Sequence, residues 1–290
     1  LNEGFTSYVE NRIIEAVYGK EQATMEQVIS QAGLQRDIKG MPKSAQVLAP
    51  KPVSGSDPDE SLSAVAYDKG AWFLAFLEER FGREHFDAFL RSYFDHFAFQ
   101  SIETAQFVAY FNENLLSRFP EAVTAKELDA WLYQPGIPSF AKAAVSERFN
   151  AVDAVRKQWQ SGRIAADEID TRGWVSQDWV RFLEGLPAKL SNEKLVELDV
   201  AFQLTTSHNG EILMRWFPLT VRSGYFEARP AMAEFLQRVG RRKLIMPVYE
   251  ALAASKEGRE FARQVFAQAR PGYHPITTAS VEAALADKKR

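Results

Sequence analysis

The chain has 290 residues, a formal net charge of -3 and no cysteine. Its hydrophobic content of 46% and charged content of 25% are typical of a soluble globular protein, and its length allows two domains. The charge gives no electrostatic basis for binding nucleic acid or an anionic membrane. The lack of cysteine excludes disulfides and thiolate zinc sites, and no apolar run approaches the roughly 20 residues that span a bilayer.

The first segment of the chain has the periodicity of a helix. Four apolar residues recur at intervals of four and predict a single stripe facing a core: Phe5, Val9, Ile13 and Val17. Glu3 and Glu10 are seven residues apart, almost two full turns, so both carboxylates project from one face. Spacing alone indicates a solvated helix with two surface glutamates.

Further helices and one irregular segment are predicted up to residue 140. The segments 69–80 and 84–97 place large aromatic residues at helical spacing. The pair Thr124 and Glu127 forms a capping-box pattern that opens a helix through Trp131. Residues 48–59 hold three Pro and one Gly, which predicts an irregular loop and a candidate cleft wall.

The second half of the chain predicts a series of paired helices. A break at residues 133–138 (Tyr-Gln-Pro-Gly-Ile-Pro) places the domain boundary at about residue 140. Paired helices in series favour an armadillo-like α-α superhelix, so the predicted fold class is all-α. The predicted helices cover residues 141–160, 176–186, 191–203, 209–221, 230–239, 247–254, 257–268 and 277–287.

The histidines of the chain do not form a zinc motif by themselves. A catalytic zinc typically takes three protein ligands, and His-Glu-x-x-His on a helix supplies two of them. The chain has only His85, His96, His208 and His274, and none belongs to such a motif. The sequence therefore offers no complete ligand set.

Several short strings, in order along the chain, resemble the leukotriene hydrolase group of gluzincin zinc aminopeptidases. They are Asn-Glu-Gly at 2–4, Asp-Pro-Asp at 57–59, Tyr-Asp-Lys-Gly at 67–70, Trp-Leu-Tyr-Gln-Pro-Gly-Ile-Pro at 131–138, Gly-Arg-Arg-Lys at 240–243 and His-Pro-Ile-Thr at 274–277. The resemblance implies the C-terminal half of such an enzyme only. Residues 1–140 would be the helical lobe of a thermolysin-like catalytic domain, and residues 141–290 the helical C-terminal domain.

The resemblance assigns roles to three residues of the first half. Glu3 corresponds to the glutamate that closes the zinc site. Glu10 would accept a hydrogen bond from a metal-bound histidine, or else is a surface glutamate near Arg12. Tyr67 would donate a hydrogen bond to the oxyanion of the tetrahedral intermediate, whereas the residues around it, without the resemblance, indicate only a packed aromatic side chain.

Three more residues would contact the substrate. Arg241 and Lys243 correspond to the pair that holds the substrate's carboxylate, a task suited to a guanidinium fork and an ammonium group. Without the resemblance, these cations and Arg242 between them indicate a solvated surface. Asp59 would face the cleft. Leu62 departs from the family pattern, because it stands where leukotriene hydrolase has a second cleft tyrosine.

The implied function is that of a zinc-dependent aminopeptidase that removes the first residue of short peptides by metal-activated water. The histidine pair, the general base and the amine-binding groups would come from the missing N-terminal half of the same protein. We therefore expect the chain alone to be inactive and to bind no zinc tightly. The expected partners are a short peptide with a free amino terminus and that missing half, with no nucleic acid and no membrane.

Two alternatives stay open. One is a non-catalytic helical scaffold whose superhelical groove binds a protein or peptide. The other is a lipid epoxide hydrolase, which Leu62 disfavours. The expected location is cytoplasmic, unless a signal peptide precedes Leu1.

Overall fold

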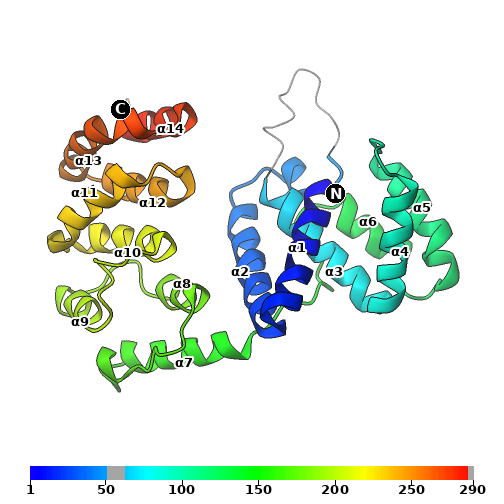
Figure 1. Ribbon diagram of the computed structural model, residues 1–290, viewed down its shortest axis with the longest axis horizontal. Helices are drawn as coiled ribbons and strands as arrows, with labels where there is room; N and C mark the ends of the chain where they lie inside the picture. Colours follow the sequence, from blue (N-terminus) through cyan, green and yellow to red (C-terminus); the bar gives the residue numbers. More distant parts are fainter. Residues whose placement is uncertain (51–62, 287–290) are drawn as a thin grey trace. The chain divides into compact units, whose positions relative to one another are not determined.

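The computed structural model describes residues 1–50 and 63–286, and within them it contains helices and no strand (Figure 1). The predicted all-α fold class is therefore confirmed. The chain divides into two compact units, Leu1–Ser146 and Glu147–Arg290. No helix in the described ranges has the length and apolar content that crossing a membrane would require.

In its described residues, the first unit contains six α-helices with shorter helical turns between them. Helix α1 packs against α2, against the π-helical turn η3 and against α3. The elements are α1 (Asn2–Tyr18), α2 (Lys20–Ile38), the 3-10 turn η1 (Lys43–Gln46), η3 (Val65–Lys69), α3 (Gly70–Phe81), α4 (Arg83–His96), α5 (Thr104–Asn114), the 3-10 turn η4 (Leu116–Arg118) and α6 (Ala125–Leu132).

Aromatic side chains fill the core of the first unit, as their helical spacing predicts. Phe73, Phe86 and Phe111 are fully buried, and Trp131 of α6 packs against Phe73 with ring centroids 5.8 Å apart. The capping box predicted at Thr124 is confirmed, since its side chain accepts a hydrogen bond from the Glu127 backbone. Helices α3, α4, α5 and α6 thus share one hydrophobic core.

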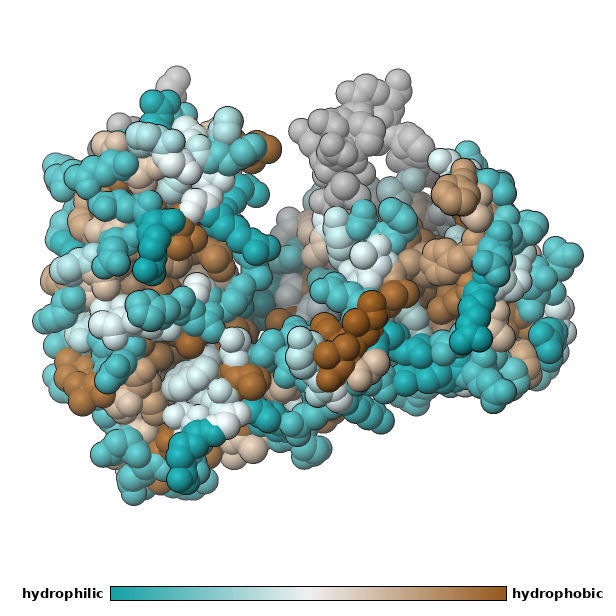
Figure 2. Space-filling view, in the orientation of Figure 1, coloured by the Kyte–Doolittle hydropathy of each residue, from teal (hydrophilic) through white to brown (hydrophobic). Residues whose placement is uncertain are grey.

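The prediction that the apolar stripe of α1 faces the core is wrong for three of its four residues. Phe5 is buried, but Val9, Ile13 and Val17 are 39%, 58% and 64% exposed. Figure 2 shows an apolar strip on the surface over α1. The contact with η3 and α3 instead uses Gly4, Phe5 and Tyr8, the buried residues of this helix, because close backbone approach at Gly4 decides which face turns inward.

The second unit stacks helices in series, and the segments α8 to α14 follow one another in Figure 1. The contacts run from α7 to α8, α8 to α10, α10 to α12, and from α12 to α13 and α14. The helices are α7 (Glu147–Gln160), α8 (Ser176–Glu184), α9 (Asn192–Phe202), α10 (Gly210–Ser223), α11 (Arg229–Arg238), α12 (Arg242–Ala253), α13 (Lys256–Ala269) and α14 (Pro275–Leu285), with 3-10 turns η5 (Ala166–Glu168), η6 (Phe226–Ala228) and η7 (Arg270–Gly272).

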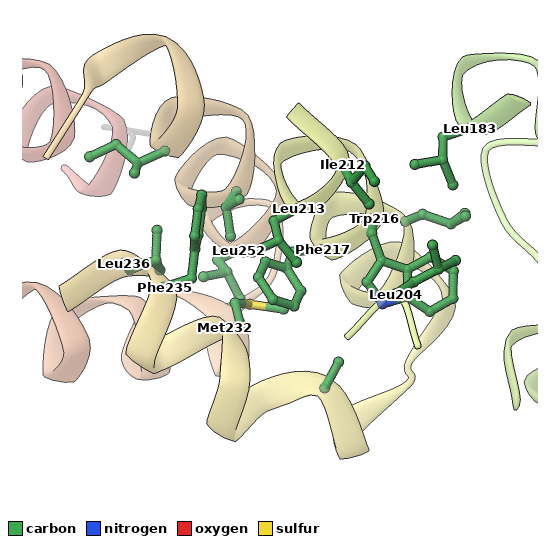
Figure 3. Packing of buried hydrophobic residues seen from close by; sticks show 14 of the residues in the cluster. Leu183, Leu204, Ile212, Leu213, Trp216, Phe217, Met232, Phe235, Leu236 and Leu252 are labelled. Carbon is green, nitrogen blue, oxygen red and sulfur yellow. The ribbon is translucent and has the colours of Figure 1, made fainter. Parts of the chain in front are cut away.

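The core of the second unit lies between these stacked helices. Phe217 of α10, Met232 and Phe235 of α11 pack together, with the two phenyl centroids 5.6 Å apart (Figure 3). At the start of the stack, the fully buried carboxylate of Asp178 accepts hydrogen bonds from Arg148 at 2.9 and 2.6 Å. This charged pair joins α7 to α8.

Two predicted helix boundaries in this half are wrong. The helix predicted over 141–160 begins only at Glu147, because residues 141–146 are irregular. The helix predicted to begin at Pro247 begins five residues earlier at Arg242, so Pro247 stands inside α12. Proline lacks one backbone donor, and here the neighbouring turns sustain the helix around it.

Candidate functional site

Glu3 and Tyr67, 64 positions apart in the chain, lie next to each other in the first unit. Glu3 projects from the first turn of α1, and Tyr67 lies in the centre of the π-helical turn η3. The Glu3 carboxylate lies close enough to the Tyr67 hydroxyl for its charge to act on the phenol. Loss of solvation and the negative charge of the nearby Glu3 carboxylate raise the pKa of Tyr67.

Two glycines bring these side chains together. A Cβ atom on Gly4 would lie 2.7 Å from the Cα atom of Gly70, so the backbones of α1 and α3 touch at this point. Only residues without a Cβ allow so close an approach. Gly4 follows Glu3, and Gly70 follows η3, so this contact fixes the distance between the carboxylate and the phenol.

The side chain of Tyr67 is partly exposed, although the turn that carries it is anchored in the core by Lys69. The exposed fraction of this tyrosine is 37%. In the same turn Lys69 points inward and is fully buried, and its ammonium group donates hydrogen bonds to the carbonyl oxygens of Gln46 and Gln134 at 2.9 and 2.8 Å. Single π-turns are rare and often occur at functional sites. The turn therefore presents one phenol to solvent on a rigid base.

Glu10 lines a cavity of about 250 Å³ between α1, α2 and α3. Asp68 and Trp72 line the same cavity. Burial, followed by the negative charge of Asp37, raises the pKa of Asp68 to about 6. The guanidinium of Arg12 pairs with Asp87 rather than with Glu10, at 2.9 Å. Glu10 thus lies on the same face of α1 as Glu3, almost two helical turns further along, beside this open cavity.

Arg241 and Lys243 lie in the second unit, at the start of α12. Arg241 is the N-cap residue and is exposed, and Lys243 lies in the first turn. The Lys243 ammonium forms an ion pair with Glu211 at 2.8 Å, and Glu211 also accepts a bond from Arg215 at 2.9 Å. Arg242 donates a hydrogen bond to Ser280 at 2.8 Å. The two predicted substrate-binding cations therefore project from a helix start.

The chain supplies one suitable ligand for a metal at Glu3. This carboxylate is partly exposed and lies beside a hydroxyl donor, which fits one position of a zinc site. In the described ranges, no three His, Cys, Asp or Glu side chains gather into a metal-binding group. Asp59 and Leu62 lie outside the described residues.

Sequence reasoning missed the residues that support this site. The buried Lys69, the glycine pair Gly4 and Gly70, and the elevated pKa of Asp68 carry no signal in hydrophobic periodicity. The one available signal is the Lys69-Gly70 pair, which follows Tyr67 by two and three residues in the sequence.

Comparison with known proteins shows which class of protein this chain resembles. Residues 1–131 match the model of the peptidase family M1 domain, and residues 174–285 match that of leukotriene A4 hydrolase, C-terminal. The first part of the chain is therefore similar to an M1 peptidase domain, and the second part to the C-terminal domain of leukotriene A4 hydrolase. More particularly, the chain is similar to the C-terminal part of leukotriene A4 hydrolase-like aminopeptidases, which confirms the resemblance predicted from the motifs.

Individual relatives agree with this assignment. Leucine aminopeptidase 2 of Yarrowia lipolytica is 28% identical over 300 residues, covering 95% of this chain and 45% of that protein. A leukotriene A-4 hydrolase homolog of Botryotinia fuckeliana is 29% identical, covering 97% of this chain and 44% of its own length. The structure of yeast LTA4 hydrolase in complex with Bestatin has a TM-score of 0.85 and 28% identity, covering 98% of this chain and 49% of that one. The chain thus spans about half the length of these relatives.

Proposed function

We propose that this chain is part of a zinc-dependent aminopeptidase that removes the first residue of short peptides. The observation that carries the proposal is the proximity of the Glu3 carboxylate and the Tyr67 hydroxyl, beside the close backbone contact of Gly4 and Gly70. A carboxylate and a phenol that meet in this way suit a metal ligand beside a donor for an oxyanion. The family comparisons support the same reading.

In this proposal each residue of the chain has a defined task. Glu3 would hold zinc, which supplies Lewis-acid polarisation of a carbonyl and an activated water. Tyr67 donates its proton in a hydrogen bond to the developing oxyanion, and its raised pKa keeps the phenol protonated at neutral pH. Glu10 orients a histidine from the other half of the protein.

Arg241 and Lys243 would bind the carboxylate of the peptide. Lys243 already shares Glu211 with Arg215, so Glu211 keeps a cationic neighbour when Lys243 turns toward substrate. This exchange costs less than leaving a carboxylate unpaired. Asp59 is proposed as a further contact with the substrate in the cleft.

The remaining half of such an enzyme would supply the two histidines and the general base. The apolar strip of α1, formed by Val9, Ile13 and Val17, is a surface that this half would cover. Isolated apolar residues on a surface need no explanation, but three in register on one helix indicate a contact. We infer that the chain alone has no peptidase activity, and that its location is cytoplasmic.

Substitution of Tyr67 tests the proposal directly. In the enzyme assembled from this chain and its upstream sequence, Tyr67→Phe should lower kcat about 100-fold or more with little change in KM, because only the oxyanion contact is lost. Tyr18→Phe, at a tyrosine that is 73% exposed at the end of α1, is the matched control and should retain full activity. The chain alone, dialysed against chelator and measured by elemental analysis, should hold no stoichiometric zinc. An unchanged kcat in Tyr67→Phe would remove the phenol from the mechanism.

A further inference from the structure

Lys69 is a buried ammonium group whose charge no acidic side chain balances among the residues that the structure describes. Its side chain is fully buried, and it forms no ion pair with any residue in the described part of the chain. Its polar contacts are the carbonyl oxygens of Gln46 and Gln134, at 2.9 and 2.8 Å. Burial lowers the pKa of Lys69 to about 8. Two neutral carbonyl groups compensate such a charge less well than a carboxylate would.

The two hydrogen bonds of Lys69 tie together segments that are distant in sequence. Gln46 ends the turn η1, and Gln134 follows the end of α6. The side chain of Gln46 in turn donates to the carbonyl oxygens of Ile38 and Met41 at 3.1 and 2.8 Å. The Lys69 ammonium group therefore links the π-turn directly to the turn η1 and to the segment after α6. Through the side chain of Gln46 it also links the π-turn to the end of α2.

The two hydrogen bonds of Lys69 to Gln46 and Gln134, called the clamp below, hold the π-turn η3, which carries Tyr67. Lys69 and Tyr67 belong to the same five-residue turn, and their side chains point in different directions, one into the core and one toward solvent. The contact between Gly70 and Gly4 fixes the end of the turn against α1. With Lys69 held inside and Gly70 held at the end, the turn has little freedom to move the phenol away from Glu3.

We propose that Lys69 is a positioning residue, whose two hydrogen bonds to Gln46 and Gln134 hold the π-turn so that the Tyr67 hydroxyl meets Glu3. A buried methionine would fill similar space without the cost of a buried charge. The lysine therefore gives this site something that packing alone does not, which is directional attachment to two backbone carbonyl groups. The catalytic consequence of this positioning rests on the proposed function, while the placement of Tyr67 does not.

The placement is measured in this chain by NMR, from nuclear Overhauser effects between the Tyr67 ring and the protons of Glu3 and Gly4. Lys69→Met removes both hydrogen bonds and should abolish these contacts or reduce their intensity by about half or more. Phe111→Leu, in a fully buried residue away from the clamp, destabilises the same unit and should leave them unchanged. Gln46→Met keeps the lysine, removes the bonds to Ile38 and Met41, and should weaken the contacts partially. Unchanged contacts in a folded Lys69→Met protein would overturn the proposal.

Kinetics in the assembled enzyme separate positioning from the role of Tyr67. Lys69→Met should lower kcat about 10-fold or more while KM changes less than about 2-fold, because a misplaced donor affects the transition state alone. Phe111→Leu should keep the kcat of the wild-type protein. If the ring contacts are lost and kcat does not change, Lys69 still positions Tyr67, but the proposed role of the phenol fails.

Discussion

At the scale of single residues, the π-turn carries an unfavourable charge at Asp68. Burial and Asp37 raise the pKa of Asp68 from 3.8 to about 6, so the folded protein binds this proton more tightly than the unfolded chain. Asp68 lines the cavity with the carboxylates of Glu10 and Glu26, which face it from α1 and α2. Stability is therefore highest below pH 3.8 with respect to this group, and it falls as the pH rises to about 6.

Replacing the Asp68 carboxylate with a neutral amide should remove this loss of stability. Asp68→Asn should raise the free energy of unfolding at pH 7 by about 1–2 kcal/mol, a value reduced for solvent screening of a partly buried group. The gain should shrink toward zero near pH 4, where the folded wild-type protein is protonated. Urea denaturation at pH 4 and pH 7 measures both values. Asp167→Asn, at an exposed residue of the second unit, is the control. Identical pH profiles for wild type and Asp68→Asn would show that Asp68 ionises freely in the fold.

At the scale of helices, the backbone contact between α1 and α3 sets the geometry of the site. A Cβ atom on Gly4 would lie 2.7 and 2.8 Å from the Cα and carbonyl carbon of Gly70, and backbone atoms cannot yield as a flexible side chain does. Gly4→Ala should therefore destabilise the protein by about 1–3 kcal/mol, despite the better helix propensity of alanine. Gly33→Ala in α2 is the matched control, because its Cβ would meet only one arginine nitrogen, at 4.0 Å.

That control should stabilise the protein by about 0.5–1 kcal/mol, the normal gain for alanine inside a helix. Midpoints of urea denaturation measure both variants under the same conditions. Comparing Gly4→Ala with Gly33→Ala separates the cost of a steric clash between α1 and α3 from the general effect of replacing glycine inside a helix. Equal stability changes in Gly4→Ala and Gly33→Ala would mean that α1 can shift away from α3 freely.

The same helices show what the sequence could and could not predict. Periodicity located α3 and α4 well, because Trp72, Phe73 and Phe86 occupy a wide apolar face. It failed on α1, where Val9 and Ile13 form a regular stripe that stays exposed. Hydrophobic spacing reports which residues need an apolar neighbour, but not whether the described chain supplies it. The close approach at Gly4 is a contact between distant segments, so no local pattern could indicate it.

The candidate site shows the same division. Motif resemblance located Glu3 and Tyr67, and the structure places them together. The resemblance did not indicate that Lys69 is buried, because a sequence does not distinguish a buried lysine from an exposed one. Arg241 and Lys243 lie between the predicted helices 230–239 and 247–254, whereas in the structure α12 begins at Arg242 and continues through Pro247. The burial of a lysine and the continuation of a helix through a proline both depend on tertiary packing. A single sequence does not report that packing.

At the scale of the whole molecule, the residues that the structure describes form two separate hydrophobic cores. One is formed by residues from Phe5 to Leu132 and the other by residues from Val152 to Leu285. Each core includes large, fully buried aromatic residues, such as Phe111 in the first and Phe217 in the second. A cavity made in one core removes contacts only from that core, so the effect should stay within one unit.

Truncation of one aromatic residue in each core tests this independence. Phe217→Ala should destabilise the second unit by about 3–5 kcal/mol, since it removes a fully buried ring. Native-state hydrogen exchange should then show faster exchange throughout residues 147–286, while the amides of the first unit, including those around Glu3 and Tyr67, keep their protection. Phe111→Ala should give the reverse pattern. Loss of protection in both units from either substitution would mean that the chain unfolds as one cooperative body, and that the site at Glu3 depends on the second core as well as on its own.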